Sequence, residues 1–248
     1  MAFSLVGLGL NPPKDITLAG LECIHGAKEV YIEVYTNRLQ LSVDELSIFL
    51  KKKITPIARK DLEESENLVK EAKKSNIALL VLGDPLFATT HIELLQRMRT
   101  AKVKISVIHN ASVINAVLDT GLQGYKFGRT VSLPYGNPAK STYDGIKQNR
   151  EIGLHSLILL DVYQEGKGFM TVKEAVELLL KMEQEFKGNV LKKTDKWVGC
   201  SSLGHPDAVI RYATPNVMVT AKFSEPPHCL IIPGKLHFME EEALNSFA

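Results

Sequence analysis

Short runs of apolar and β-branched residues alternate with longer amphipathic segments through the first half of the chain. The longer segments have apolar residues three and four positions apart, which is typical of helices that bury one face. The pattern predicts strands at 3–8, 29–35, 54–58, 77–83 and 103–109, and helices at 18–28, 43–52, 61–74 and 91–101. Nearly continuous hydrophobic strands that are separated by helices indicate a parallel sheet covered on both faces. The first half is therefore predicted to be an α/β domain.

The pattern becomes less regular after about residue 110, where we expect a domain boundary. A polar stretch with Gly136, Pro138 and Gly145 lies in this half, and Thr171 and Glu174 have the spacing of a helix capping box. The predicted elements are helices at 112–121 and 171–187 and strands at 155–163, 196–201 and 228–234. We therefore expect two α/β domains that pack closely, residues 1–109 and 110–248.

Composition excludes several classes of protein. Of the 248 residues, 45% are hydrophobic and 23% are charged, as in ordinary globular proteins, and the net charge of +2 gives no reason to expect nucleic acid or an acidic membrane as a partner. The cluster Lys51–Lys53 is interpreted as a solvated helix face. Three well-separated cysteines predict neither a disulfide framework nor a thiolate metal site. With no apolar run near the roughly 18 residues that a membrane helix needs and no signal-peptide pattern, we expect a cytosolic protein.

Candidate ligand chemistry lies at the ends of the predicted strands, because ligands of open parallel sheets bind beyond the carboxyl ends of the strands. We expect these junctions to converge on one rim. They are Gly7-Leu8-Gly9-Leu10, Gly83-Asp84-Pro85, Asn110-Ala111-Ser112, Asp161 and Pro233-Gly234.

A dinucleotide-binding loop is the first interpretation to weigh for G-L-G-L. That fingerprint needs a third glycine and an immediate helix, whereas Pro12 and Pro13 follow here and the next helix is predicted to begin near Thr17. Glu33 could serve as the ribose-binding acid, but acids at strand ends are common. The dehydrogenase interpretation is therefore disfavoured.

Three other positions have both a structural and a functional interpretation. Asp84 either organises a turn or points a carboxylate at a ligand, and its place at the same sheet edge as the first loop favours the ligand. Thr89 or Thr90 can cap the helix near His91, and Ser112 either caps a helix or contacts a polar ligand. His228 is either a core residue or a pocket-edge residue. The histidines lack metal-ligand spacing, and there is no G-x-S-x-G elbow or P-loop.

The motifs together resemble the diphthine synthase family of tetrapyrrole-methylase-like methyltransferases. The resemblance extends from residue 3 to about 242, and the Gly-Asp-Pro and Pro-Pro-His blocks are its most specific parts. The matching motifs are G-L-G-L (7–10), D-I-T-x-x-G-L-E (15–22), E-x-Y-T (33–36), G-D-P-L-x-A-T-T-H (83–91), V-I-H-N-A-S (107–112), Y-K-F-G (125–128), L-L-D (159–161) and P-P-H-x-L-I-I-P-G-x-L-H (226–237).

The resemblance implies a homodimeric enzyme with a parallel N-terminal sheet, a mixed C-terminal sheet and a cofactor cleft between the domains. It implies S-adenosylmethionine as cofactor, left as S-adenosylhomocysteine, and the amino group of a modified histidine on translation elongation factor 2 as methyl acceptor in diphthamide biosynthesis. Members differ in whether they stop at a trimethylated amine or also methylate a carboxylate. By position, the implied cofactor contacts are Leu10, Asp84, Phe87, Ser112, Val113, Leu160, Leu203 and His228.

The sequence departs from the family pattern at three places. Phe87 is bulkier than expected, Ser201-Ser202 replaces an Ala-Arg pair, and the segment 134–141 lacks a Trp-Pro element. A methyltransferase acting on a tetrapyrrole or other small molecule, and a nucleotide-binding protein without turnover, therefore remain as alternatives.

Methyl transfer from a sulfonium needs alignment and exclusion of water rather than a metal or a covalent nucleophile. A protonated amine must lose its proton, and Asp84, Asp161 and His228 are possible acceptors. The five junctions contain no lysine or arginine, which suits a cationic ligand. Gly7 and Gly9 are expected to let the cofactor approach the backbone closely.

Overall fold

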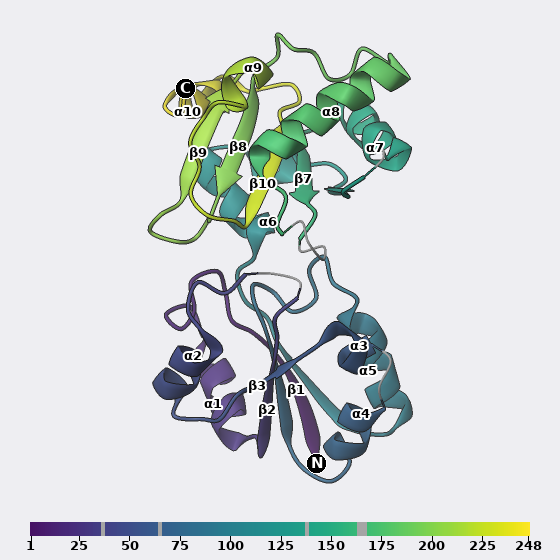
Figure 1. The fold of residues 1–248 in the computed structure, drawn as a ribbon, viewed down its shortest axis with the longest axis vertical. Coiled ribbons are helices and arrows are strands. Elements are labelled where there is room, and N and C mark those ends of the chain that lie inside the picture. Colours follow the sequence, from purple (N-terminus) through teal and green to yellow (C-terminus); the bar gives the residue numbers. More distant parts are fainter. Residues whose placement is uncertain (36–37, 64–65, 137–138, 163–167) are drawn as a thin grey trace. The chain divides into compact units, whose positions relative to one another are not determined.

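The computed structural model describes residues 1–35, 38–63, 66–136, 139–162 and 168–248. The predicted segments that include Thr36, Pro138 and Tyr163 thus lie partly outside the described residues. The chain forms two compact units, Met1–Ile114 and Asn115–Ala248, which are described separately below (Figure 1).

The N-terminal unit contains the predicted parallel sheet. Every pairing between its strands is parallel, and their order is β3-β2-β4-β1-β5. The strands are β1 (Ala2–Gly7), β2 (Glu29–Glu33), β3 (Thr55–Ile57), β4 (Ile77–Val81) and β5 (Lys104–Ile108). Because β1 lies between β4 and β5, the carboxyl ends of these three strands are neighbours at one edge of the sheet.

Helices cover both faces of this sheet, as Figure 1 shows with α1 and α2 on one side and α3, α4 and α5 on the other. Each face buries its own apolar cluster, one around Leu5 and Leu79 and the other around Val6 and Leu80. Alternate residues of one strand point to opposite faces, so a strand buried on both sides is hydrophobic throughout. The helices are α1 (Leu18–Gly26), α2 (Val43–Leu50), α3 (Arg59–Glu63), α4 (Asn67–Ala72) and α5 (His91–Thr100), and the short helix α6 (Val113–Ala116) crosses the boundary between the two units. The helix predicted at 61–74 is therefore two helices.

The C-terminal unit is built on the mixed sheet that the family resemblance implies. Its order is β6-β7-β10-β8-β9, in which β6 and β7 are parallel and the other pairs are antiparallel. The strands are β6 (Val131–Leu133), β7 (Ser156–Leu160), β8 (Trp197–Ser201), β9 (Val209–Ala213) and β10 (His228–Ile232). The helices are α7 (Lys140–Glu151), α8 (Val172–Phe186), α9 (Pro215–Met218) and α10 (Phe238–Asn245), with 3-10 turns η1 (Val117–Thr120) and η2 (Gly124–Lys126).

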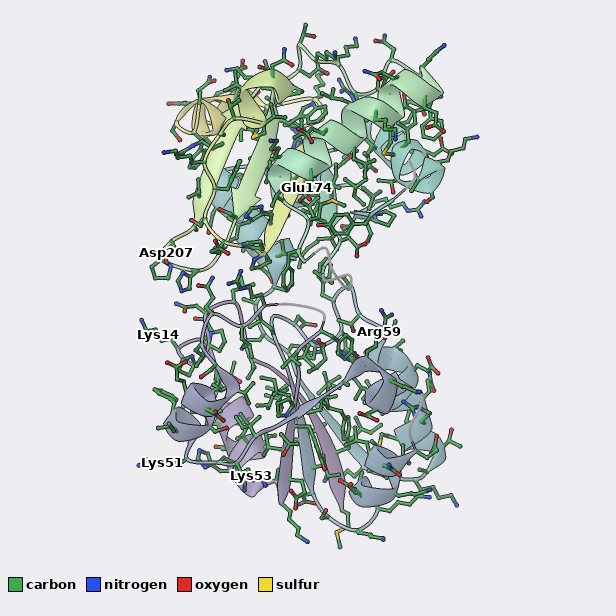
Figure 2. All side chains as sticks on the ribbon, viewed as in Figure 1. Lys14, Lys51, Lys53, Arg59, Glu174 and Asp207 are labelled. Carbon is green, nitrogen blue, oxygen red and sulfur yellow. The ribbon has the colours of Figure 1, made fainter. Side chains whose placement is uncertain are left out.

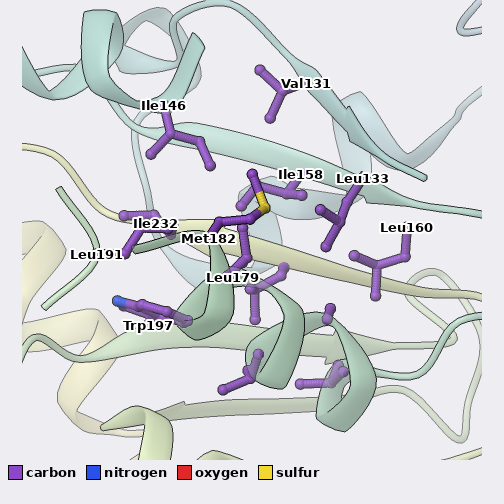
Figure 3. Close-up of a cluster of buried hydrophobic side chains, with 14 of the residues drawn as sticks. Val131, Leu133, Ile146, Ile158, Leu160, Leu179, Met182, Leu191, Trp197 and Ile232 are labelled. Carbon is purple, nitrogen blue, oxygen red and sulfur yellow. The ribbon is translucent and has the colours of Figure 1, made fainter. Parts of the chain in front are cut away.

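The core of this unit lies between α8 and the sheet. Leu179 and Met182 project from α8 toward Ile158, Ile232 and Trp197 on the strands (Figure 3). The predicted capping box begins α8: the Thr171 hydroxyl accepts from the Glu174 amide, and the Glu174 carboxylate accepts from the Thr171 amide. Glu174 is labelled in Figure 2.

The lysine cluster after α2 only partly follows the prediction. Lys51 and Lys53, labelled in Figure 2, are exposed, as expected for a solvated face. Lys52 instead folds back, and its Nζ donates to the carbonyl of Ala27 at 2.5 Å, next to the end of α1. A cation at the carboxyl end of a helix complements the helix dipole, so this lysine stabilises the end of α1. Among the described residues, no helix combines the length and apolar character needed to cross a bilayer.

Candidate functional site

The loops after β1 and β4 are joined directly by backbone hydrogen bonds. The Gly83 amide donates to the Gly9 carbonyl at 2.8 Å, and the Gly9 amide donates to the Gly83 carbonyl at 3.3 Å. Gly9 has a φ of +74° and Gly83 a φ of +77°, values that other residues rarely adopt. This isolated antiparallel bridge sets the loop of residues 7–10 beside the loop of residues 83–87.

Asn110 and Asp15 complete the connection to the loop after β5. The Asn110 side-chain amide donates to the carbonyl of Gly7 at 3.0 Å and to that of Asp15 at 2.9 Å. The Asp15 carboxylate in turn accepts from the amides of Leu10 and Asn11, at 3.1 and 2.8 Å. Asn110 was predicted only as part of a junction, and no role was predicted for Asp15. The available signal was an asparagine directly after a buried strand, because its side-chain amide can form hydrogen bonds to two neighbouring loops.

Asp84 lies in the middle of this connected edge. Its carboxylate accepts from the amide of Leu86 at 2.9 Å and the amide of Asn110 at 3.3 Å, and it pairs with Nδ1 of His109 at 2.8 Å. Partial burial by itself raises the pKa of Asp84, but these three hydrogen bonds outweigh it and leave the pKa below its ordinary value. Asp84 is therefore ionised at neutral pH, and it both organises the turn and joins two loops.

The other sequence-predicted contacts of this unit lie on the same loops. Leu10 and Phe87 are partly exposed, as is Val113 at the start of α6. Ser112 is only 5% exposed, and its Cβ would lie 3.5 Å from a Cβ built on Gly83. The structure thus brings together Leu10, Asp84, Phe87, Ser112 and Val113 at the carboxyl edge of the parallel sheet.

The space beside the two N-terminal glycines is taken by the chain itself. A Cβ on Gly7 would lie 2.7 Å from the Gly83 carbonyl oxygen, and a Cβ on Gly9 would lie 2.4 Å from Cβ of Asp15. Glycine is therefore needed at these positions because neighbouring loops come very close to the backbone. The expected role of Gly7 and Gly9, to let a ligand approach the backbone, is therefore only part of the reason why glycine occupies these positions.

Glu33 does not have the position that a ribose-binding acid needs. Its side chain is 1% exposed and faces Nε2 of His91 at 3.4 Å. As predicted, α5 begins at His91, and the Thr89 hydroxyl accepts from the His91 amide at 3.3 Å. The buried pair lies behind the loop of residues 83–91 rather than on its outer surface.

The remaining candidate residues lie at one edge of the mixed sheet in the C-terminal unit. His228, the first residue of β10, pairs with Ser201 at the end of β8, and Leu159 of β7 pairs with Cys229. Leu160 ends β7, and Leu203 follows β8. The structure therefore groups Leu160, Leu203 and His228 at this edge.

Both ring nitrogens of His228 are engaged by the backbone. Nδ1 accepts from the Val172 amide at 3.1 Å, and Nε2 donates to the Ser224 carbonyl at 2.7 Å. Burial lowers the pKa of His228, although the bond to Ser224 acts against it. The ring is thus neutral, with its proton on Nε2, and holds the first turn of α8 against β10. The expectation that His228 could accept a proton from an amine is not supported, because Nδ1 is already occupied.

Ser201 and Ser202, the departure from the family pattern, have clear structural roles. The Ser201 hydroxyl accepts from the Ser224 amide at 3.0 Å, and the Ser202 hydroxyl donates to the Glu225 carbonyl at 2.7 Å. The Ser202 amide also donates to the carbonyl of Pro227. These bonds fix the segment that leads into His228.

One predicted junction lies at the wrong edge. Because β10 is antiparallel to β7, its carboxyl end pairs with the beginning of β7, and the Gly234 amide donates to Nδ1 of His155. Pro233-Gly234 is therefore at the edge opposite to Leu160 and His228. The expectation that all five junctions share one rim is wrong, since it assumed parallel strands throughout.

Comparison with known proteins places this arrangement in a family. A family model described as Tetrapyrrole (Corrin/Porphyrin) Methylases matches residues 2–189. The chain is 40% identical to a probable diphthine methyl ester synthase of Arabidopsis thaliana, over 98% of this chain and 97% of that protein. It is 38% identical to a diphthine synthase of Methanosarcina barkeri, over 99% and 95% of the two chains.

Solved structures give the same relationship. The crystal structure of a putative diphthine synthase from Entamoeba histolytica matches with a TM-score of 0.92 at 35% identity, covering 99% of this chain and 98% of that one. A second crystal structure, of a diphthine synthase, also matches with a TM-score of 0.92 at 35% identity. The chain therefore belongs to the tetrapyrrole methylase family and, within it, to the diphthine synthases, which are methyltransferases.

Proposed function

We propose that this methyltransferase uses S-adenosylmethionine to methylate the amino group of a modified histidine on translation elongation factor 2, in the synthesis of diphthamide. The observation that carries the proposal is the similarity to diphthine synthases over nearly the full length of both chains. The proposed cofactor contacts are Leu10, Asp84, Phe87, Ser112 and Val113 of the N-terminal unit and Leu160, Leu203 and His228 of the C-terminal unit.

The residues of the N-terminal edge suit such a cofactor. S-adenosylmethionine, when bound, supplies a methyl group activated by a positively charged sulfur. Residues 7–10, 83–87 and 110–113 contain no lysine or arginine, and they include the ionised Asp84. A carboxylate and backbone carbonyls favour a cation over an anion, while Leu10, Phe87 and Val113 offer apolar surface to an adenine ring or a methylene chain.

In this proposal the chain acts mainly by positioning. The hydrogen bonds of Asp84 and Asn110 hold three loops in one arrangement before a ligand arrives, so little ordering remains to be done on binding. Asp84 would contact the cofactor rather than accept a proton, because its lowered pKa makes it a weak base. His228 would contribute a fixed neutral surface.

Thermal unfolding with and without cofactor tests the binding step. Saturating S-adenosylmethionine or S-adenosylhomocysteine is expected to raise the melting temperature of the wild-type protein by about 5 °C or more. Asp84→Ala should abolish this shift. Glu29→Ala is the control, because Glu29 is an exposed acid at the first position of β2, at the amino edge of the same sheet. Absence of binding to the wild-type protein at millimolar cofactor would overturn the proposal.

Transfer of a labelled methyl group tests the substrate. Incubation with unmethylated elongation factor 2 carrying the modified histidine is expected to place label on the protein, and mass spectrometry gives the number of methyl groups. Label that appears only on added tetrapyrroles or other small molecules would contradict the protein substrate. We also propose a homodimer, for which light scattering should give twice the mass of the chain.

A further inference from the structure

A buried histidine and a buried glutamate lie directly behind the loop that carries Asp84. His91 is 2% exposed and Glu33 is 4% exposed. They come from different elements, since His91 is the first residue of α5 and Glu33 is the last residue of β2. Burying two titratable side chains costs free energy unless each is hydrogen-bonded, so this pair needs an explanation.

His91 closes the loop of residues 83–91 on itself. Its Nδ1 lies 3.0 Å from the carbonyl oxygen of Pro85, and the hydroxyl of Thr89 donates to the same carbonyl at 3.3 Å. The His91 amide donates back to that hydroxyl. Two side chains thus hold the Pro85 carbonyl, one residue from Asp84 and two from Phe87.

The geometry fixes the orientation of the His91 ring. Nδ1 of His91 must carry a proton in order to donate to the Pro85 carbonyl. Nε2 then faces the Glu33 carboxylate at 3.4 Å. The ring is thus held with Nδ1 toward the Pro85 carbonyl and Nε2 toward the Glu33 carboxylate.

Glu33 is itself held by its strand. The amide of Tyr35 donates to its other carboxylate oxygen at 3.2 Å. Strand β2 pairs in parallel with β4, with Ile32 beside Leu80, so the carboxylate lies next to the strand from which the Asp84 loop emerges. The support of the loop therefore comes from the neighbouring strand of the same sheet.

We propose that His91, backed by Glu33, is a positioning residue for the cofactor: it holds the Pro85 carbonyl and thereby sets the turn of Asp84 and Phe87. This inference rests on the proposed function, in which Asp84 and Phe87 contact S-adenosylmethionine. It predicts that loss of the Nδ1 donor weakens cofactor binding more than it lowers the rate at saturating cofactor.

Steady-state kinetics of folded variants test the proposal. His91→Leu is expected to raise KM for S-adenosylmethionine about tenfold or more while kcat changes less than about threefold. His91→Asn, whose side-chain amide nitrogen can take the place of Nδ1, should bring KM back to within about threefold of the wild-type value. Thr89→Val, a substitution of the same size at a partly exposed residue, removes the second donor to Pro85 and should raise KM in the same direction. It provides the test if His91→Leu does not fold.

His155→Leu is the matched control. His155 is also buried, pairs with a buried glutamate, Glu240, at 2.9 Å, and lies at the edge of the mixed sheet opposite to Leu160. The His155→Leu substitution should lower the melting temperature and leave KM for the cofactor unchanged. The inference would be overturned if the folded His91→Leu and Thr89→Val variants kept the wild-type KM for S-adenosylmethionine, or if only kcat fell. Failure of the wild-type protein to bind the cofactor would instead overturn the proposed function.

Discussion

Single side chains, together with the backbone bridge between Gly9 and Gly83, join the three loops at the carboxyl edge of the parallel sheet. Asn110 bonds the loop after β5 to Gly7 and Asp15, and Asp15 holds the amides that follow Gly9. These bonds involve or lie next to Gly7 and Gly9, where an added Cβ would clash with a neighbouring loop. Changes at those positions should therefore act on the whole edge.

Gly9→Ala tests this at one residue. The substitution requires alanine at a φ of +74° and places its Cβ 2.4 Å from Cβ of Asp15. We expect the free energy of unfolding to fall by about 2–4 kcal/mol, measured by urea denaturation. Gly26→Ala is the control, because among the described residues, apart from its chain neighbours and the backbone of its own helix, no atom lies within 4 Å of the added Cβ, and the residue ends α1. It should change stability by less than about 1 kcal/mol. Equal effects of the two substitutions would contradict the explanation.

The sequence alone could place single residues but not their partners. Asp84 and His228 were predicted as candidate site residues because turn-forming and proline-flanked residues at strand ends have local signatures. The partner of Asn110 at Gly7 is 103 residues away, and that of His228 at Val172 is 56 residues away. Such pairs depend on strand order and direction, which no local pattern gives.

Among the secondary-structure elements, α10 depends most clearly on one charged side chain. Glu240 is fully buried and accepts from Lys126, His155 and the amides of Gln123 and His237. Burial alone would raise the pKa of Glu240, but these donors lower it to about 2. The carboxylate therefore ties α10 to η2 and to the residue that precedes β7.

Glu240→Gln should destabilise the protein by about 3 kcal/mol at pH 7, because Lys126 loses a buried counter-charge. The folded-state pKa lies below the ordinary value of 4.5, so the contribution of the carboxylate is present above about pH 4.5 and is lost as pH falls toward 2. Urea denaturation at several pH values should show that the difference in the free energy of unfolding between wild type and Glu240→Gln becomes smaller below about pH 4. Glu185→Gln, at an exposed residue of α8, should show no such difference. A difference in unfolding free energy that does not change with pH would contradict the role assigned to the Glu240 carboxylate.

Elements with strong hydrophobic periodicity were predicted and those shaped by packing were not. Helix α7 was missed because Gly145 and polar residues fill its sequence, yet a Cβ on Gly145 would lie 2.6 Å from Val131. Glycine there permits close contact with β6, which outweighs its poor helix propensity. In the part of the chain that the structure describes, strand β9 pairs only with β8, and it is half-buried, so its hydrophobic pattern is weak. Helices α9 and α10 are short and were also missed.

At the scale of the whole molecule, each unit has its own sheet, its own hydrophobic core and its own group of proposed cofactor contacts. The fold class followed from the hydrophobic pattern in the N-terminal unit, where all strands are parallel. The mixed sheet of the C-terminal unit came from the family resemblance. The pattern of that unit gave no strand directions, which is why Pro233-Gly234 was assigned to the wrong edge.

Hydrogen exchange tests whether both groups contact one cofactor. In the full chain, saturating S-adenosylhomocysteine should slow amide exchange by about threefold or more at residues 83–87 and 110–113 and also around Leu203 and His228. Residues 102–104, at the amino edge of the parallel sheet, are the internal reference and should not change. Protection confined to one unit would contradict the proposed cofactor contacts of the other unit.

The single tryptophan of the chain, Trp197, is completely buried in the core of the C-terminal unit. Its fluorescence therefore reports the packing of that unit alone, whereas far-ultraviolet circular dichroism reports helices in both. Denaturation curves recorded with the two signals would coincide if the units melt together and would separate if one melts first. The native sequence thus carries its own optical label for distinguishing cooperative from stepwise unfolding.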